Sequence, residues 1–460
     1  MAAPHVDDRP LAFADLAAWF AEGGKDPAAF RVGAEHEKFV FRTADHSPVP
    51  YEGESGIKAL MQGLMRFGWA PTTEHAQGGS GGSETLIGLS RGMANVSLEP
   101  GGQFELSGAP LDSMHDICAE TGAHLEEVKT VAAELGLGFL GLGFAPTWRR
   151  DQVPIMPKGR YQIMRRYMPK VGSLGLDMMF RTCTVQANLD FADEADMVAK
   201  FRVSLALQPI ATALFANSPF TEGKPNGWLS ARANVWTDTD ADRTGLLDFV
   251  FDDDFGFASY ARYALQVPMY FVKRDGVYHD VAGRSFADFM AGALPELPGE
   301  RATIADWADH ISTIFPEVRL KQYLEMRGAD AGPWSRLCAL PALWAGLLYC
   351  PDCQAAAWDL CREWTSEARA RLRGDAARLG LKAEIGGRTA QDIAKAMLAI
   401  AHEGLKRRNR ISAGLVDETG YLAQVEEIAA TGVTAAERLL EAYHGPWNGD
   451  IGQVFEACAY

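Results

Sequence analysis

The sequence predicts an α+β fold built around an antiparallel sheet, and two observations support this prediction. Helical and strand-like periodicities both occur along the chain, but without the regular strand–helix–strand alternation of a parallel sheet. The stretch after Trp334 contains few β-branched runs and many Ala, Leu, Glu and Arg residues, which favours a helical layer. We therefore expect one unit over residues 1–460, with a sheet-forming part at 1–330 and a mainly helical layer packed on it at 331–460.

Individual elements can be assigned in order along the chain. Helical periodicity is clear in four segments before the helical layer, Leu11–Phe20, Gly56–Phe67, Asp112–Leu135 and Asp193–Phe215. Strand-like alternation lies between them, and four strand candidates carry unusual polar residues: Arg31–Phe41, Ser97–Ser107, Phe180–Asp190 and Arg319–Arg327. The glycine-rich segment Gly78–Gly82 lacks the Lys-Ser/Thr of a phosphate-binding loop and is predicted to be a hairpin loop.

Charge and composition exclude several classes of protein. The 460 residues contain 44 Lys plus Arg and 60 Asp plus Glu, a net charge of −16, which argues against a broad nucleic-acid or anionic-membrane surface. Seven cysteines are too few for a disulfide scaffold. Met1–Pro10 has no apolar core of a signal peptide, and the apolar run Leu337–Cys350 is shorter than the roughly 20 residues of a membrane span. We expect a soluble cytoplasmic protein without nucleic-acid or membrane partners.

Each of the four strand candidates places polar groups on one face, because side chains alternate along a strand. Glu35 and Glu37 share a face of the first strand, about 7 Å apart. In the second strand, Glu99, Gln103 and Glu105 share one parity, and the Gly101-Gly102 pair allows a bulge that re-aims Glu99. The third strand aligns Thr182, Thr184, Gln186 and Asn188, and the fourth aligns Lys321, Tyr323, Glu325 and Arg327.

Five glutamates on these faces predict a cation site. For one strand alone, a solvent-facing polar side explains such residues, but their recurrence on four strands argues for a shared cavity. Converging carboxylates repel one another unless cations lie among them. Mg²⁺ takes only one or two carboxylates per ion together with phosphate oxygens, so we expect two or three Mg²⁺ ions, or Mn²⁺ in their place, with a nucleotide. The Cys/His spacing of a zinc site is absent.

Several long motifs resemble the plant-type glutamate–cysteine ligases of plants and many proteobacteria. The similarity runs from about Ala14 to Tyr460 and is carried by the segments Gly33–Phe39, Leu98–Gly108, Met156–Tyr161, Met168–Gln186, Pro219–Gly227 and Leu324–Asp330. The resemblance implies a glutamine-synthetase-like fold, in which an antiparallel sheet forms a funnel with helices on its outer side.

The resemblance also implies an activity, the first step of glutathione biosynthesis. ATP, L-glutamate and L-cysteine give γ-glutamylcysteine, ADP and phosphate by way of a γ-glutamyl phosphate. Two alternatives remain open: a γ-glutamyl ligase that uses another amine, and a non-catalytic amino-acid or nucleotide sensor with the same fold. The sensor is disfavoured because all five metal-ligand candidates are present.

Roles follow from the resemblance residue by residue. Glu35, Glu37, Glu99, Glu105 and Glu325 resemble the metal ligands, and Arg327 resembles the cation that contacts the transferred phosphoryl group. Gln186 occupies a polar position near the metal and phosphate. For the substrates, Arg160 and Arg232 resemble the arginines that hold the glutamate carboxylates, Tyr270 resembles a wall of the cysteine pocket, and Trp228 or Trp236 is expected to stack against glutamate. Core packing is the alternative role for each aromatic residue.

The cysteines bear on regulation. In the plant members, one disulfide joins positions that match Cys118 and Cys338, and a second joins positions that match Val281 and Glu296. A redox switch that depends on the second bond is therefore not expected here. The sequence leaves open the Cys118–Cys338 bond, the oligomeric state and feedback by glutathione. Cys350-Pro-Asp-Cys353 has the spacing of a redox motif but follows an apolar helix, so we expect a helix-connecting turn.

Overall fold

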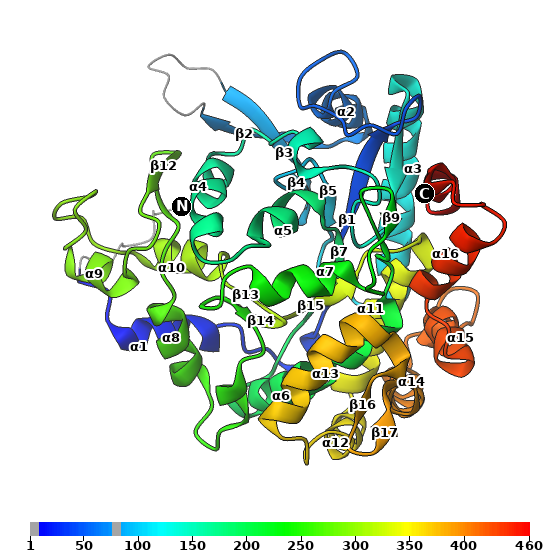
Figure 1. The fold of residues 1–460 in the computed structure, drawn as a ribbon. Coiled ribbons are helices and arrows are strands. Elements are labelled where there is room, and N and C mark those ends of the chain that lie inside the picture. Colours follow the sequence, from blue (N-terminus) through cyan, green and yellow to red (C-terminus); the bar gives the residue numbers. More distant parts are fainter. Residues whose placement is uncertain (1–8, 76–83) are drawn as a thin grey trace.

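A large antiparallel sheet forms the centre of the protein, as seen in a computed structural model that describes residues 9–75 and 84–460 (Figure 1). Within these residues its strand order is β14-β15-β7-β1-β5-β4-β3-β2, and β6 pairs with β1 beyond the end of β5. All of its pairs are antiparallel. The strands are β1 Val32–Arg42, β2 Ala70–His75, β3 Glu84–Arg91, β4 Ala94–Leu98, β5 Phe104–Ser107, β6 Leu137–Leu140, β7 Thr184–Leu189, β14 Val318–Leu320 and β15 Leu324–Asp330.

Long helices cover one face of this sheet. Three of them pack directly on its strands, α3 (Met114–Leu135), α6 (Glu194–Phe215) and α11 (Trp334–Leu348), and α14 (Ala390–Arg408) packs on α11. The ring of His36 on β1 contacts that of His124 on α3, so α3 lies on the face opposite to Glu35 and Glu37. By length and composition α6 could cross a membrane, but 83% of its most apolar window is buried inside the fold, which identifies it as a core helix.

Shorter elements surround these layers. The remaining helices are α1 Phe13–Ala21, α2 Ile57–Leu64, α4 Gly159–Tyr167, α5 Gly175–Arg181, α7 Ala231–Val235, α8 Phe257–Gln266, α9 Phe286–Ala291, α10 Ile304–Ile311, α12 Pro351–Asp359, α13 Ser366–Leu379, α15 Ala423–Thr431, α16 Ala435–His444 and α17 Val454–Ala457. Short strand pairs are β8 Phe220–Thr221 with β9 Lys224–Pro225, β10 Thr244–Gly245 with β13 Phe315–Pro316, β11 Phe271–Arg274 with β12 Val277–Asp280, and β16 Glu384–Ile385 with β17 Arg388–Thr389.

The predicted helices are confirmed, and local capping explains their limits. Before α3, the Ser113 side chain accepts the Asp116 N–H, and the helix ends at Gly136 in the left-handed region with φ of 66°. Before α6, Asp193 accepts the Asp196 N–H in the same way. The short helices α4, α5 and α7 to α10, which lie between residues 159 and 311, were not among the predicted elements.

Two predicted strands are hairpins. Ser97–Ser107 was expected to be one strand, but the chain reverses after β4, where Glu99 and Gln103 close a turn with a 2.9 Å backbone hydrogen bond. Gly102 adopts φ of 84° there, which glycine tolerates, so the Gly-Gly pair makes a turn and not a bulge. Arg319–Arg327 likewise reverses between β14 and β15. The third predicted strand starts late, at Thr184, because α5 extends to Arg181.

The main apolar cluster extends from Leu16 to Phe455 and draws on both the sheet-forming and the helical part of the chain. This shared core supports the expectation of one unit, which stays a prediction. A disulfide joins Cys118 of α3 to Cys338 of α11, and the other five cysteines are free. At the two positions that match the second disulfide of the plant enzymes, Val281 is buried and Glu296 forms an ion pair with Arg284. The predicted loop at Gly78–Gly82 lies outside the described residues.

Candidate active site

The register of the central strands gathers the predicted carboxylates on one face of the sheet. Glu37 of β1 lies opposite Glu105 of β5, and Glu35 lies opposite Gln186 of β7. One strand further, Asn188 of β7 lies opposite Glu325 of β15. Directly opposed residues of antiparallel strands point to the same side. Four of the five glutamates therefore share this face, and Glu99 follows from the turn after β4.

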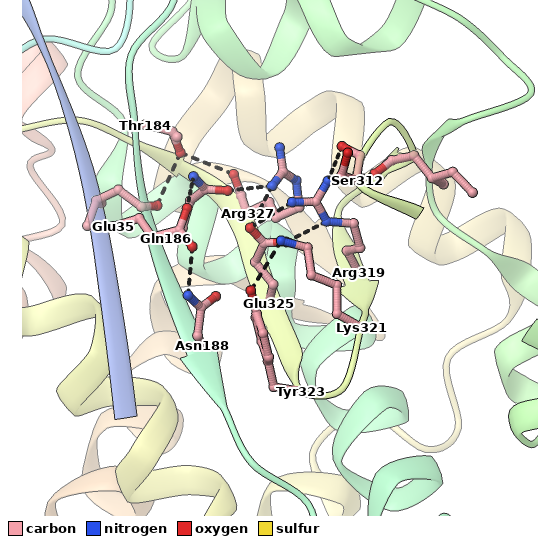
Figure 2. A network of polar contacts seen from close by, with 12 residues as sticks. Glu35, Thr184, Gln186, Asn188, Ser312, Arg319, Lys321, Tyr323, Glu325 and Arg327 are labelled. Atoms are coloured by element: carbon pink, nitrogen blue, oxygen red, sulfur yellow. Dashed lines mark hydrogen bonds and ion pairs between the residues drawn. The ribbon is translucent and has the colours of Figure 1, made fainter. Parts of the chain in front are cut away.

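Glu35 and Glu37 are held by neighbours on β7. The Asn188 side chain donates a 2.7 Å hydrogen bond to Glu35 Oε1, and Gln186 Nε2 donates a 3.1 Å hydrogen bond to Glu35 Oε2 (Figure 2). Glu37 accepts the backbone N–H of Thr184 at 2.9 Å. These contacts orient the two carboxylates without neutralising their charge.

Burial and mutual repulsion make these carboxylates hard to ionise. Burial, followed by the charges of Glu325 and Glu105, raises the pKa of Glu35 to about 7. Burial and the charges of Glu99 and Glu105 raise the pKa of Glu37 well above its usual range. Burial and Glu99 also raise the pKa of Glu105. Ionisation of these carboxylates on one face of the sheet is therefore energetically unfavourable unless cations bind there.

Glu325 differs, because cations surround it. Arg319 forms two hydrogen bonds to its carboxylate, at 2.5 and 2.9 Å, and Arg327 Nη1 lies 2.9 Å from the same group (Figure 2). Burial by itself raises the pKa of Glu325, but Arg319, Lys321 and Arg327 outweigh it and hold the pKa well below its usual range. Arg327 also donates a 2.5 Å hydrogen bond to Gln186 Oε1, which links the two predicted catalytic residues.

A small cavity of about 80 Å³ opens above this face. Its lining includes several predicted residues: Glu37, Glu99, Arg160, Arg232, Trp236 and Arg327. The Nε atoms of Arg160 and Arg232 are buried and have no hydrogen-bond partner among the described residues. A buried donor without an acceptor lowers stability, so both guanidinium groups are suited to donate hydrogen bonds to an anionic ligand. Typical ligand pockets start near 300 Å³, so substrates require side chains to move.

Two predicted substrate residues do not line this cavity. Trp228 packs against the small apolar cluster of Phe144, Ala231 and Val235. Tyr270 is fully buried, with the guanidinium of Arg243 3.8 Å from its ring centroid. Their assignment to substrates stays a prediction, and in the structure Tyr270 is buried and Trp228 half-buried against these packing partners.

Sequence reasoning missed two cations at the site. Arg319, the main partner of Glu325, was identified only as the start of a strand, and its position opposite Glu325 follows from the β14–β15 hairpin. Lys158 precedes Arg160 in a motif already noted, and burial, followed by the charge of Arg160, lowers the pKa of Lys158 to about 8. For Arg319 the available signal was the alternation of side chains in a hairpin, and for Lys158 it was a second basic residue in the motif of Arg160.

The metal assignment is less direct. Across residues 9–75 and 84–460, no group of three or more His, Cys, Asp or Glu side chains has the arrangement of a metal site. The carboxylates share a face and repel one another, but they do not converge on one point. The five metal ligands therefore stay a prediction.

Known proteins resemble this chain over nearly its whole length. A family model described as glutamate-cysteine ligase family 2 matches residues 31–457. The chloroplastic glutamate–cysteine ligase of Arabidopsis thaliana is 55% identical over 456 residues, which are 99% of this chain and 84% of that protein. The chloroplastic enzyme of Nicotiana tabacum is 54% identical over 465 residues, covering 100% of this chain and 86% of that protein.

A solved structure shares the fold. The glutamate–cysteine ligase of Francisella tularensis in complex with AMP superposes with a TM-score of 0.53 at 12% identity, covering 90% of this chain and 85% of that chain. The predicted α+β fold is therefore confirmed. The predicted cytoplasmic location is contradicted, because the relatives named above are chloroplastic enzymes.

Proposed function

The chain belongs to glutamate–cysteine ligase family 2, and we propose that it joins L-glutamate to L-cysteine at the expense of ATP. One observation carries this proposal beyond membership of the family. Three arginines, Arg160, Arg232 and Arg327, line the same small cavity as the carboxylates Glu37 and Glu99. A site with both signs of charge suits substrates that carry phosphates, carboxylates and an ammonium group.

The reaction must activate a poor electrophile. In the first step, a γ-carboxylate oxygen of glutamate attacks the γ-phosphorus of ATP, the bond to the β-phosphate oxygen breaks, and ADP leaves. In the second step, the amine of cysteine attacks the acyl phosphate carbon, phosphate leaves with the bonding electron pair, and the amine loses a proton. Both steps benefit from fixed reactants and from charges that face the phosphoryl group.

Arg327 is suited to contact that phosphoryl group. Its guanidinium lines the cavity, and its Nη1 donates to both Glu325 and Gln186. A guanidinium can donate two parallel hydrogen bonds to phosphoryl oxygens. Its Nη2 and Nε have no hydrogen-bond partner among the described residues, so they are available to substrate while Gln186 and Glu325 hold Nη1. Gln186 therefore has a positioning role in the proposed mechanism.

Arg160 and Arg232 are suited to the carboxylates of glutamate. Arg232 is buried and Arg160 is half-buried, and each of these cavity-lining residues has a buried Nε without a hydrogen-bond partner among the described residues. Arg232 also donates a 2.8 Å hydrogen bond to the backbone oxygen of Arg327, which couples the glutamate and phosphoryl positions. The ring of Trp236 forms a cavity wall beside Arg232. Glutamate bound in this way has its γ-carboxylate near Arg327.

The donor set fits Mg²⁺. Glu35, Glu37, Glu99 and Glu105 supply hard oxygen atoms, and none of the four forms an ion pair with another described residue. We propose that they hold two or three Mg²⁺ ions, or Mn²⁺, and that Glu325 joins them through Oε2 when Arg319 turns away. Bound ions supply positive charge for the phosphate oxygens.

A direct assay tests the proposed function. Purified protein is incubated with ATP, Mg²⁺ and glutamate, and ADP release and peptide product are measured with cysteine and then with a panel of other amines. We expect turnover with cysteine and its close analogues and a product of the mass of γ-glutamylcysteine. Turnover that favours another amine supports the alternative of a γ-glutamyl ligase for a different acceptor. Absence of ADP release under every combination supports the alternative of a non-catalytic sensor.

A further inference from the structure

Two cysteines lie at the start of helix α12, outside the sheet that carries the carboxylates. Cys350 is the residue before the first turn and Cys353 lies within it. Cys350 has an extended backbone, with φ of −120° and ψ of 114°, which folds its side chain over the helix start. The Cys350 Sγ accepts the backbone N–H of Cys353 at 3.4 Å. Both thiols are free, so the two sulfurs are neighbours that are not bonded.

Positive charge lies next to the Cys350 sulfur. Arg407, which extends from α14, places its Nη1 4.0 Å from Cys350 Sγ. The same guanidinium is held at this position by Asp352 at 2.6 Å and Glu403 at 2.7 Å. The start of a helix adds the partial positive charge of its free N–H groups. Basic groups and helix starts are the surroundings in which reactive cysteines occur.

The two thiols are not equivalent. Burial and then the adjacent Cys350 thiol raise the pKa of Cys353 to about 12. Cys353 is also one turn further into the helix and has no basic contact within 4 Å in the described part of the chain. The first cysteine is therefore the one arranged to attack, and the second is placed to resolve an adduct on the first.

The cysteine pair lies just beneath the surface, and the residues next to it in the chain are exposed or line a cavity. Cys350 and Cys353 are only 6% and 4% exposed, but Pro351 and Asp352 between them are exposed. A cavity of about 690 Å³ between α6 and α12 reaches Pro351 and Gln354. The Nε2 atom of Gln354 is buried there without a hydrogen-bond partner among the described residues. Arg407, which contacts the Cys350 Sγ, is itself about half exposed.

We propose that Cys350 and Cys353 form a redox-active dithiol that reacts with low-molecular-weight disulfides. The Cys350 thiolate attacks one sulfur of the disulfide, the S–S bond breaks, and one thiol leaves. The Cys353 thiol, on losing its proton, then attacks the Cys350 sulfur and releases the second thiol. One external disulfide is reduced to two thiols, and one protein disulfide forms. This site is separate from both the Cys118–Cys338 bond and the cavity that contains Arg327.

Thiol trapping with oxidised glutathione as the probe tests this proposal. The full-length protein is equilibrated in buffers of increasing oxidised-to-reduced glutathione ratio, alkylated and mapped by mass spectrometry. We expect Cys350 and Cys353 to lose reactivity together and to appear as one internal disulfide. In Cys353→Ser we expect a stable glutathione adduct on Cys350, because the resolving thiol is absent. In Cys350→Ser we expect little adduct on Cys353.

Two controls separate this behaviour from general thiol oxidation. Cys361→Ser removes another buried free cysteine beyond the end of α12 and should leave the oxidation of the pair unchanged. Arg407→Gln in the Cys353→Ser background should slow adduct formation at least about threefold, whereas Arg438→Gln, which removes a surface ion pair with Glu427, should not. Thermal melts check that each variant folds.

Three results overturn the proposal. The first is that both thiols stay reduced at every glutathione ratio in folded protein. The second is that the adduct forms equally on Cys350 and Cys353 in the single variants. The third is that Arg407→Gln leaves the rate unchanged. In those cases Cys350 serves only to cap α12.

Discussion

Arg319 and Glu325 face each other across the β14–β15 hairpin and form a buried two-point ion pair, with Nε–Oε2 and Nη2–Oε1 distances of 2.5 and 2.9 Å. Arg327 Nη1 also donates to Oε1 of this carboxylate, at 2.9 Å. A residue expected to bind cations is thus already neutralised by the protein. Glu325 can bind a divalent cation only if this arrangement changes.

Removal of Arg319 should destabilise the protein. Arg319→Met leaves the buried Glu325 charge with one fewer partner, and we expect the free energy of unfolding to fall by about 3 kcal/mol. Urea denaturation followed by circular dichroism measures it. The matched control is Arg66→Met, which breaks an exposed pair with Glu134 and should cost less than about 1 kcal/mol. Equal losses in the two variants would contradict the importance of the buried pair.

Arg327→Lys should retain nucleotide binding and lose turnover. An ammonium cannot reproduce the two parallel hydrogen bonds of a guanidinium, and such a transition-state contact typically contributes about 100–1000-fold in rate. Steady-state ADP release and nucleotide titration separate the two effects. Arg284→Lys, at an exposed pair with Glu296, is the control and should behave as wild type. Full activity in Arg327→Lys is the result that would refute the assigned role.

Divalent cations should be required, and Glu37 should help to bind them. Removal of metal with a chelator should abolish turnover, and Mg²⁺ should restore it. Glu37→Gln removes one charged oxygen ligand, so Mn²⁺ affinity, measured by electron paramagnetic resonance, should weaken at least about tenfold. Glu52→Gln changes an exposed carboxylate that pairs with Lys58 and should leave the affinity unchanged. Unchanged Mn²⁺ binding in Glu37→Gln would remove Glu37 from the proposed ligands.

The Cys118–Cys338 bond should affect stability and not activity. It closes a segment of 220 residues, and its loss in Cys118→Ser should cost on the order of a few kcal/mol, visible in thermal melting. Because Val281 and Glu296 replace the second family disulfide, turnover should be the same in reduced and oxidised dithiothreitol. A several-fold difference in turnover that vanishes in Cys118→Ser would overturn this expectation. A difference that vanishes in Cys353→Ser would assign a redox switch to Cys350 and Cys353.

His310 should make the protein sensitive to mild acid. Its imidazole is buried and lies 2.8 Å from the Ala264 carbonyl oxygen, and burial lowers its pKa to about 4. The unfolded chain, with a pKa near 6.5, binds the proton first. Stability contributed by His310 is therefore complete above pH 6.5 and declines as pH falls toward 4, by up to about 3 kcal/mol.

A substitution isolates this effect. His310→Gln keeps a donor for the Ala264 carbonyl but does not titrate, so its free energy of unfolding should fall less between pH 6.5 and 4 than that of wild type. Urea unfolding at several pH values measures the difference. His444→Gln, at an exposed histidine, should follow the wild-type curve. Parallel curves for His310→Gln and wild type would show that His310 does not contribute.

Local pattern predicted much of this fold. The periodicity of α3 and α6 extends over six turns each and is bounded by capping side chains, so both helices could be placed almost to the residue. The alternation of β1 likewise placed Glu35 and Glu37 on one side. Such features depend only on residues close in sequence, where backbone geometry dictates which side chains share a face.

Turns within polar strands were harder to recognise. Glu99 and Glu105 keep one parity whether the chain continues or reverses, so the β4–β5 hairpin reads as a single strand with a bulge. The same ambiguity concealed the β14–β15 hairpin and therefore the pairing of Arg319 with Glu325. The aromatic residues Trp228 and Tyr270 posed a similar problem, because residue type does not distinguish core packing from a binding pocket.

The amino-acid sequence was therefore sufficient for the fold class, the family and the face of each strand that carries charge. Tertiary structure decided which charges meet: Arg319 with Glu325, Arg327 with Gln186, and Arg407 with Cys350. The reason is physical. Side-chain direction along a strand or helix follows from local backbone geometry, whereas the partner of a buried charge depends on strand register, hairpin reversal and side-chain packing between segments far apart in the chain.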